Sequence, residues 1–199
     1  MTMSTETVRL DSQSVGDPAR YLTLDELQRG LESLPAAPRD HGRVVALVRR
    51  DAEGVRHVEP RVHLTPEAGL PGDAWGRKRT PNPESQLAVI QMDVATLIAN
   101  GQPLPLFGDN LFLDLDLSTA NLPAGSRVRA GQALLEVTPQ PHNGCRKLSA
   151  RFGPDALTFV SMRERRHLNL RGIYMRVIEA GAVCAGDPVE VLLRAAGER

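Results

Sequence analysis

The stretch GSRVRAGQALLEV, residues 125–137, has the pattern of two short strands joined by a turn at Ala130-Gly131. Apolar and polar residues alternate on both sides of the turn, as expected for strands with one buried face. The stretch GAVCAGDPVEV, residues 181–191, repeats the order of short strand, Ala-Gly turn and longer strand. Two such units predict β-hairpins within a barrel, since a tandem repeat array needs more copies.

Other segments have the same β character and are separated by Gly, Pro or Asp-rich turns. The predicted strands lie at residues 43–50, 55–64, 87–92, 111–117 and 172–179. The predicted helices are short, at 24–34, 94–99 (capped by Asp93), 157–166 and a turn or two beginning at Cys145. Many short strands with few helices predict a mainly β fold, a β-barrel, rather than alternating βαβ units.

The chain divides by composition into an N-terminal extension, residues 1–40, and a barrel domain, residues 41–199. The extension carries one predicted helix over 24–34, which Thr23 can cap and Pro35 stops. Its leucines recur at helical spacing on one side, so this helix docks either on the barrel domain or on a partner.

The composition limits the functional classes. The 199 residues include 24 Lys+Arg and 24 Asp+Glu, so the net charge indicates no nucleic-acid partner. No apolar run is long enough to span a membrane, and the N-terminus lacks a secretory signal. Two cysteines make no disulfide framework. We therefore expect a cytoplasmic protein with reduced thiols.

Cys145 is the strongest candidate for chemistry, because a Pro/Gly-rich loop delivers it to the predicted start of a helix. Arg146, Lys147 and Arg151 follow it, and cations beside a helix N-terminus favour the thiolate form. A thiolate attacks sulfur or binds a soft metal. The competing interpretation is a small buried apolar side chain, and this is the better interpretation of Cys184.

Several other polar residues could serve a site. Cations gather at Arg77, Lys78 and Arg79, around Cys145, and at Arg163, Arg165, Arg166 and Arg171. Converging loops at one barrel end could bring such residues together around a phosphate or another anion. The histidines lack the spacing of a structural zinc site. His142 could orient Cys145 or act as its base, or it could lie on a loop surface.

Seven motifs, in order, resemble the MOSC domain, the family named after the C-terminal domain of molybdenum cofactor sulfurase. They are LTPEAGLPGD at 64–73, FGDNL at 107–111, residues 125–131, LEVTP at 135–139, CRKL at 145–148, RGIYMRV at 171–177 and AGDPV at 185–189. Their order and spacing agree with the family over about residues 42–193. Many members place proline before the cysteine, where this chain has Asn143-Gly144.

The resemblance implies a mostly β-barrel fold and a stand-alone member of the family. It implies that Cys145 carries sulfur or coordinates molybdenum in the context of the molybdenum cofactor, molybdopterin. The cofactor-binding residues implied by the motifs are Arg146, Lys147, Arg77, Asn110 and Arg171. The partners implied are a sulfur-donating desulfurase or a redox partner protein, together with a small-molecule substrate.

Four functional hypotheses follow. Cys145 could bear a persulfide and pass sulfur to an acceptor, or it could hold molybdenum in a reductase of N-hydroxylated compounds. Alternatively, the barrel could be a non-catalytic module that binds a phosphorylated ligand, with Cys145 merely packed. The fourth hypothesis is a thiol-redox sensor, in which Cys184 is the only candidate for the resolving thiol.

Overall fold

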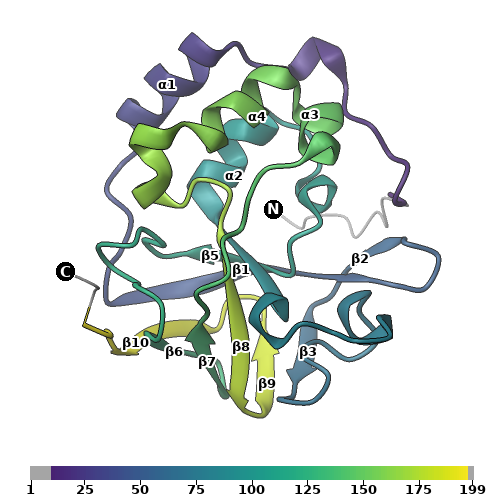
Figure 1. Ribbon diagram of the computed structural model, residues 1–199, viewed down its shortest axis with the longest axis vertical. Helices are drawn as coiled ribbons and strands as arrows, with labels where there is room; N and C mark the ends of the chain where they lie inside the picture. Colours follow the sequence, from purple (N-terminus) through teal and green to yellow (C-terminus); the bar gives the residue numbers. More distant parts are fainter. Residues whose placement is uncertain (1–9, 197–199) are drawn as a thin grey trace.

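The computed structural model describes residues 10–196 and has a closed seven-stranded β-barrel at its centre (Figure 1). The strand order is β10-β6-β7-β8-β4-β5-β1, and pairing between β10 and β1 closes the ring. These strands are β1 (His41–Arg50), β4 (Leu87–Gln91), β5 (Leu111–Asp114), β6 (Arg127–Ala130), β7 (Ala133–Val137), β8 (Ile173–Glu179) and β10 (Pro188–Leu193). The predicted barrel is confirmed.

Three further strands lie outside the ring. The short β2 (Arg56–Val58) pairs with the end of β1, after the predicted turn at 51–54. A separate two-stranded sheet joins β3 (Arg61–Leu64) to β9 (Gly181–Cys184). The single strand predicted over 55–64 is therefore divided in two. Pro60 lies at the break, where the missing N–H cannot join a ladder.

Short helices cover one end of the barrel (Figure 1). The α-helices are α1 (Leu24–Ser33), α2 (Met92–Ala99), α3 (Arg146–Phe152) and α4 (Pro154–Ser161). The short 3-10 helices are η1 (Pro18–Arg20), η2 (Trp75–Arg77), η3 (Pro83–Ser85), η4 (Leu104–Phe107) and η5 (Arg163–Leu168). Within residues 10–196, none of these helices has both the length and the apolar content needed to cross a bilayer.

Two apolar clusters make up the core. The first fills the barrel, where alternate residues of β7 (Ala133, Leu135 and Val137) point inward. The second lies between the barrel wall and the helices and contains Phe112 and Phe159. Each fully buried aliphatic or aromatic side chain contributes about 1.5–3 kcal/mol of transfer free energy. Regular alternation on the strands thus explains why this chain closes into a ring with an apolar interior.

The helix predicted over 24–34 forms as α1 and docks within the chain. Thr23 and Glu26 make a reciprocal capping box: the Thr23 hydroxyl accepts from the Glu26 amide, and the Glu26 carboxylate accepts from the Thr23 amide. Leu27 is fully buried against α2 and α4. The helix thus packs on the barrel domain, while the boundary drawn at residue 40 stays a prediction.

Three other local expectations were wrong. The stretch 125–137 forms the hairpin β6–β7, but 181–191 does not, since β9 pairs with β3 while β10 pairs with β6 and β1. Its turn instead bonds to β1, with the Gly186 amide donating to the Val44 carbonyl. Gln91, not Asp93, is the N-cap of α2, and Asp93 lies in the first turn. The helix expected at 157–166 is two pieces, α4 and η5.

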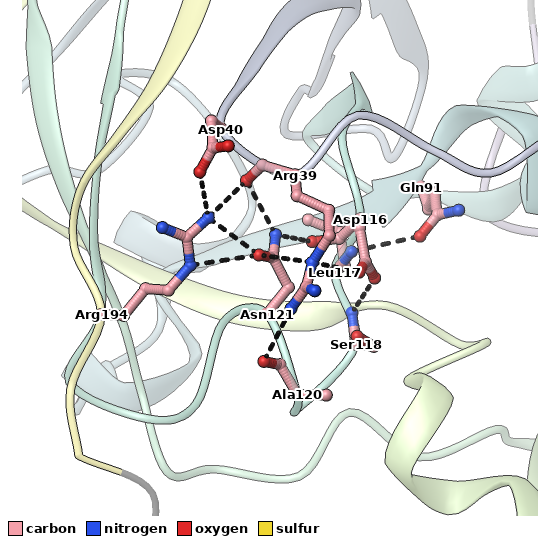
Figure 2. A network of polar contacts seen from close by, with 9 residues as sticks. All are labelled: Arg39, Asp40, Gln91, Asp116, Leu117, Ser118, Ala120, Asn121 and Arg194. Atoms are coloured by element: carbon pink, nitrogen blue, oxygen red, sulfur yellow. Dashed lines mark hydrogen bonds and ion pairs between the residues drawn. The ribbon is translucent and has the colours of Figure 1, made fainter.

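A polar network centred on Asn121, after β5, joins three segments that are distant in sequence (Figure 2). The buried Asn121 amide donates to the carbonyls of Arg39 and Asp116, at 3.0 and 2.8 Å. Its oxygen accepts from the guanidinium of Arg194, just after β10, at 3.0 and 3.2 Å. Because Asn121 satisfies backbone groups of both loops, it ties the connection after α1 to the end of β5 and to the chain's last strand.

Candidate functional site

A cavity of about 590 Å³ lies among the loops on the helix-covered side of the barrel. Its walls come from the β1–β2 turn, from η2 and the residues beside it, from the segment around Cys145, and from side chains of α3 and β8. A second cavity of about 440 Å³ shares His142, Asn143 and Arg171 with the first. The loop 141–145 therefore separates two hollows at this end of the barrel.

Cys145 is exposed and lines the first cavity. It is the N-cap residue of α3, as the sequence predicted, in extended backbone with φ −140° and ψ 172°. The preceding Gly144 allows this approach, because a Cβ there would lie only 2.6 Å from the Leu157 side chain on α4. Glycine at 144 thus lets the loop lie against α4 while it holds the thiol at the cavity.

Two of the arginines at the cavity are neutralised by buried carboxylates. Arg50 binds Asp73 through two nitrogens, at 3.1 and 2.6 Å, and the Arg50 amide donates to the same carboxylate. The Arg50 guanidinium lowers the pKa of Asp73 against the opposing effect of burial. Nη1 of Arg171 donates to both oxygens of Asp109, at 2.9 and 2.8 Å. These pairs hold the walls in place.

Two other buried arginines have no carboxylate partner among residues 10–196. Arg56 and Arg151 are 4% and 6% exposed, and neither forms an ion pair in this part of the chain. Burial, followed by repulsion from Arg151 and Arg50, lowers the pKa of Arg56 to about 10. Burial also lowers the pKa of Arg151, and the nearby Cys145 opposes that change. The cavity therefore holds, beside the thiol, two buried cations that form no ion pair with residues 10–196.

The side chain of His142 is buried beside this cationic wall. Its ring stacks on Tyr174 with centroids 4.3 Å apart, and its Nδ1 lies 3.6 Å from Asp109 without a hydrogen bond. Burial, followed by the charge of Arg171, lowers the pKa of His142 to about 3. The ring is therefore neutral near pH 7, and the sequence alternative of a surface histidine is excluded. Burial also raises the pKa of Tyr174.

The depressed pKa of His142 makes folding sensitive to acid. Between about pH 6.5 and 3, His142 is protonated in the unfolded chain and neutral in the folded chain. The contribution of His142 to the free energy of unfolding therefore falls as the pH falls. We expect a loss of about 1.4 kcal/mol per pH unit below about pH 6 from this residue. Urea denaturation of wild type and His142→Gln between pH 7 and 5 measures it.

The matched control for that experiment is His167→Gln, whose histidine is exposed. We expect His142→Gln to flatten the dependence of the free energy of unfolding on pH, and His167→Gln to leave it as in wild type. Parallel slopes for all three proteins would show that His142 accepts a proton as easily in the folded state as in the unfolded chain.

The structure brings some of the predicted site residues to the cavity. Lys147, Arg77 and Arg171 line it together with Cys145. The Arg77 guanidinium donates to the carbonyls of Gly72, Arg50 and Asp51, so it pins the loop after β3 to the β1–β2 turn. Each of the three predicted groups of cations therefore contributes at least one residue to this cavity.

Two predicted residues are placed elsewhere. Arg146 is exposed and lines neither of the two cavities. Asn110 is buried, where its amide oxygen accepts from the Ala88 amide and its amide nitrogen donates to the Val48 carbonyl. Asn110 thus joins β4 to β1 beneath the cavity, where Ala88 is part of the wall. Cofactor contacts by these two residues stay a prediction.

Sequence reasoning missed Arg50, Arg56, Tyr174 and Trp75, all of which line the cavity. Arg50 and Arg56 flank a turn and looked like ordinary strand-end cations. Tyr174 lies inside RGIYMRV, one of the motifs that resemble the MOSC family. His142, on which its ring stacks, lies on a distant loop. The one signal available in the sequence was an arginine on each side of the turn 51–54. This signal becomes informative only once the fold places α3 opposite the turn.

The comparisons with known proteins agree with the barrel fold and with the motifs in the sequence. The model of the MOSC domain matches residues 77–190, which is more than half of the chain. The chain belongs to the MOSC domain family. A search of curated proteins found no match.

Solved structures resemble this MOSC domain in fold. The YuaD protein from Bacillus subtilis is 23% identical, with a TM-score of 0.56, covering 78% of this chain and 98% of that one. YiiM from Escherichia coli is 27% identical, with a TM-score of 0.51, covering 77% and 71%. YiiM from Geobacillus stearothermophilus is 18% identical, with a TM-score of 0.52, covering 81% and 78%.

Two hypotheses drawn from the sequence, metal binding and a thiol-redox sensor, can be compared with this structure. The described residues 10–196 contain no group of three or more His, Cys, Asp or Glu suited to hold a metal ion. Both cysteines are free. Cys145 begins α3 and Cys184 ends β9, and these elements lie at opposite ends of the molecule (Figure 1), which disfavours Cys184 as a resolving thiol.

Proposed function

We propose that this MOSC domain binds the molybdenum cofactor in the 590 Å³ cavity, with Cys145 as the residue that carries sulfur or holds molybdenum. One observation carries the proposal: an exposed thiol opens onto the same cavity as two buried arginines that have no carboxylate partner in residues 10–196. A soft sulfur ligand beside uncompensated positive charge suits a soft metal on an anionic organic group.

The donor set fits such a group. The buried nitrogens Arg56 Nε and Arg171 Nε have no hydrogen-bond partner among the described residues, and both arginines face the cavity. Buried donors without partners cost free energy, which an anionic ligand would recover. Lys147 and Arg77 would add charge at the rim, and Cys145 would supply the thiolate. The bound cofactor would supply redox chemistry at molybdenum.

In the sulfur-carrier role, the Cys145 thiolate attacks the outer sulfur of a cysteine persulfide on a donor protein such as a desulfurase; the donor's S–S bond breaks and the donor cysteine leaves as a thiolate. A nucleophilic acceptor then attacks the outer sulfur, the S–S bond breaks, and Cys145 leaves as a thiolate. The exposure of Cys145 suits both encounters, because each partner must reach the sulfur. The cations nearby stabilise the leaving thiolate.

In the reductase role, the chain's residues bind and orient. Arg171, held by Asp109, and neutral His142 form one wall of the cavity. An N-hydroxylated compound would be the substrate, and electrons would come from a separate redox partner protein.

The test is the variant Cys145→Ser, compared with Cys184→Ser. We expect wild type and Cys184→Ser, purified without oxygen from a cofactor-producing host, to retain molybdenum and pterin or to carry a persulfide sulfur. Cys145→Ser should lose molybdenum and sulfur, while its melting temperature stays within a few degrees because its side chain is exposed.

Elemental analysis by mass spectrometry, pterin fluorescence and intact mass measure these contents. Alkylation supplies a second readout: the thiol at 145 should react faster near pH 7 than the partly buried thiol at 184. Absence of metal, pterin and bound sulfur from the anaerobic wild-type protein would contradict the proposal. A large drop in melting temperature for Cys145→Ser would assign the residue a structural role instead.

A further inference from the structure

A segment at the start of the described chain, residues 10–16, bridges two walls of the first cavity (Figure 1). At one end, Leu10 pairs with Arg56 of β2, and the Arg56 amide donates to the Leu10 carbonyl at 2.8 Å. At the other end, the Gly16 amide donates to a carbonyl of α3 at 3.1 Å. Between these ends, Ser12 lines the cavity. The segment therefore runs from β2 to α3 across one side of the cavity.

Backbone carbonyls of this segment bind the two arginines that have no carboxylate partner among the described residues. The Asp11 carbonyl accepts from Nη1 of Arg56 at 2.9 Å, and the Ser14 carbonyl accepts from Nε of Arg151 at 3.4 Å. The second distance is long for a hydrogen bond, so this contact is weak. The segment is thus held on the cavity's arginines by two backbone carbonyls and not by an ion pair.

Few apolar contacts hold the segment in place. None of residues 10–16 is buried, and Val15 is 68% exposed. Within the segment, only Leu10 packs against the core, where it is partly buried beside the second apolar cluster. A segment with little apolar burial and with hydrogen bonds near the surface opens at much lower free energy than the whole fold. Residues 10–16 can therefore detach while the barrel stays folded.

The chain after residue 16 is anchored to buried parts of the fold. The Asp17 amide donates to Oε1 of the buried Gln102 at 2.8 Å. The Tyr21 hydroxyl donates to the Ala150 carbonyl at 2.9 Å, and α1 follows with Leu27 fully buried. Any opening of residues 10–16 must therefore turn at the junction between residues 16 and 17, and it leaves α1 in place.

Gly16 lies at this junction and touches α3 with its backbone. A Cβ at this position would lie 1.7 Å from the carbonyl oxygen of Arg151, which is backbone and cannot rotate away. Glycine is therefore the residue that allows the segment to lie against α3. A side chain at position 16 would push the segment off the helix.

We propose that residues 10–16 are a flap that opens and closes over the Arg56–Arg151 side of the cavity while the rest of the fold stays intact. The flap is closed in this structure, where its carbonyls bind both guanidinium groups. The purpose of the flap rests on the proposed function, since its opening would let the molybdenum cofactor enter or leave the cavity. The flap lies outside residues 77–190, which the MOSC model matches, so membership of the family does not by itself imply it.

Hydrogen–deuterium exchange of the full-length wild-type protein, followed by NMR, tests the flap. The Arg56 amide reports on it, because its partner is the Leu10 carbonyl. The Val137 amide, which donates to the Ser126 carbonyl in the barrel, reports on global unfolding. Corrected for intrinsic rates, the Arg56 amide should exchange at least about 100-fold faster than the Val137 amide, although Arg56 is buried. Equal protection of the two amides would overturn the proposal, because residues 10–16 would then open only with the whole fold.

The variant Gly16→Val should hold the flap open, and Gly76→Val is its matched control. A Cβ on Gly76 would meet only the Ala68 carbonyl oxygen, at 3.8 Å, so valine is accommodated there. We expect both variants to melt within a few degrees of wild type, because the flap contributes no buried side chain. A much lower melting temperature for Gly16→Val alone would show that residues 10–16 are an integral part of the fold and would overturn the proposal.

Phenylglyoxal, which modifies accessible guanidinium groups, measures what the flap covers. Peptide mass spectrometry identifies the modified residues. We expect Arg56 and Arg151 to react at least about tenfold faster in Gly16→Val than in wild type or Gly76→Val, because the open flap exposes them. Arg171, which a buried carboxylate holds, should react slowly in all three proteins. Unchanged reactivity of Arg56 and Arg151 in Gly16→Val would mean that the flap does not control access to this side of the cavity.

Failure of the flap and failure of the proposed function are distinguishable, because none of these measurements needs a bound cofactor. A flap that opens in a protein that never carries molybdenum, pterin or sulfur would overturn the proposed function alone. A wild-type protein that carries the cofactor, but whose Arg56 amide exchanges only through global unfolding, would overturn the flap alone.

Discussion

Replacing Asp109 with alanine is expected to lower the free energy of unfolding by about 3–5 kcal/mol, one of the two largest effects of a single substitution that we predict. Asp109 is fully buried and accepts two hydrogen bonds from Nη1 of Arg171, whose side chain is also buried. Without the carboxylate, Arg171 becomes a third buried cation beside Arg56 and Arg151. Urea denaturation at neutral pH measures the loss.

The control is Asp114→Ala, which removes a half-exposed carboxylate 3.8 Å from Arg43 on the barrel surface. Exposed pairs of this kind contribute about 0–1 kcal/mol, so we expect a change of about 0.5 kcal/mol or less. The double variant Asp109→Ala/Arg171→Met should recover much of the stability, because it leaves no charge behind. Equal costs for Asp109→Ala and Asp114→Ala would mean that water reaches Arg171 freely.

Replacing Val137 with aspartate is expected to cost about 4 kcal/mol or more and to unfold much of the protein at room temperature. Val137 is 4% exposed, its side chain packs in the barrel interior, and it pairs with Met175 across β7 and β8. A carboxylate there has neither water nor a cation, so the folded state must bury it or take up a proton. Far-UV circular dichroism and urea denaturation measure the outcome.

Val58→Asp is the matched control, since it makes the same substitution at a valine that is 61% exposed on β2. We expect it to change the free energy of unfolding by less than about 1 kcal/mol. Val137→Ala separates charge from volume, with an expected cost of about 2 kcal/mol from the cavity it leaves. A folded Val137→Asp protein with wild-type stability would show that the barrel interior admits water.

Local sequence was sufficient for much of the fold. The alternation of apolar and polar residues over 125–137 predicted the hairpin β6–β7. The cap at Thr23 and the leucines that follow it at helical spacing predicted α1. These signals work because a strand or a helix with one apolar side must bury that side. The second unit, 181–191, has the same pattern but pairs with β3, β6 and β1, because pairing partners are chosen by the closure of the ring and not by the pattern itself.

The site was predictable only in part. Placement of Cys145 at the start of α3 follows from the loop and helix signals around it. Arg56 gave no such signal, because a single arginine on a short strand is ordinarily solvated. Its burial depends on α3, on Gly108 after η4 and on the segment around Asp11, which are distant in sequence and meet only in the folded chain.

By itself, the sequence determined the class of fold, the position of the thiol and the motifs of the MOSC family, since each rests on residues that are neighbours in the chain. Only the tertiary structure decided which arginines are neutralised. Asp73 and Asp109 take Arg50 and Arg171, while Arg56 and Arg151 find no carboxylate within residues 10–196. Charge compensation depends on distances of a few ångströms between distant segments, and those distances exist only once the barrel has closed.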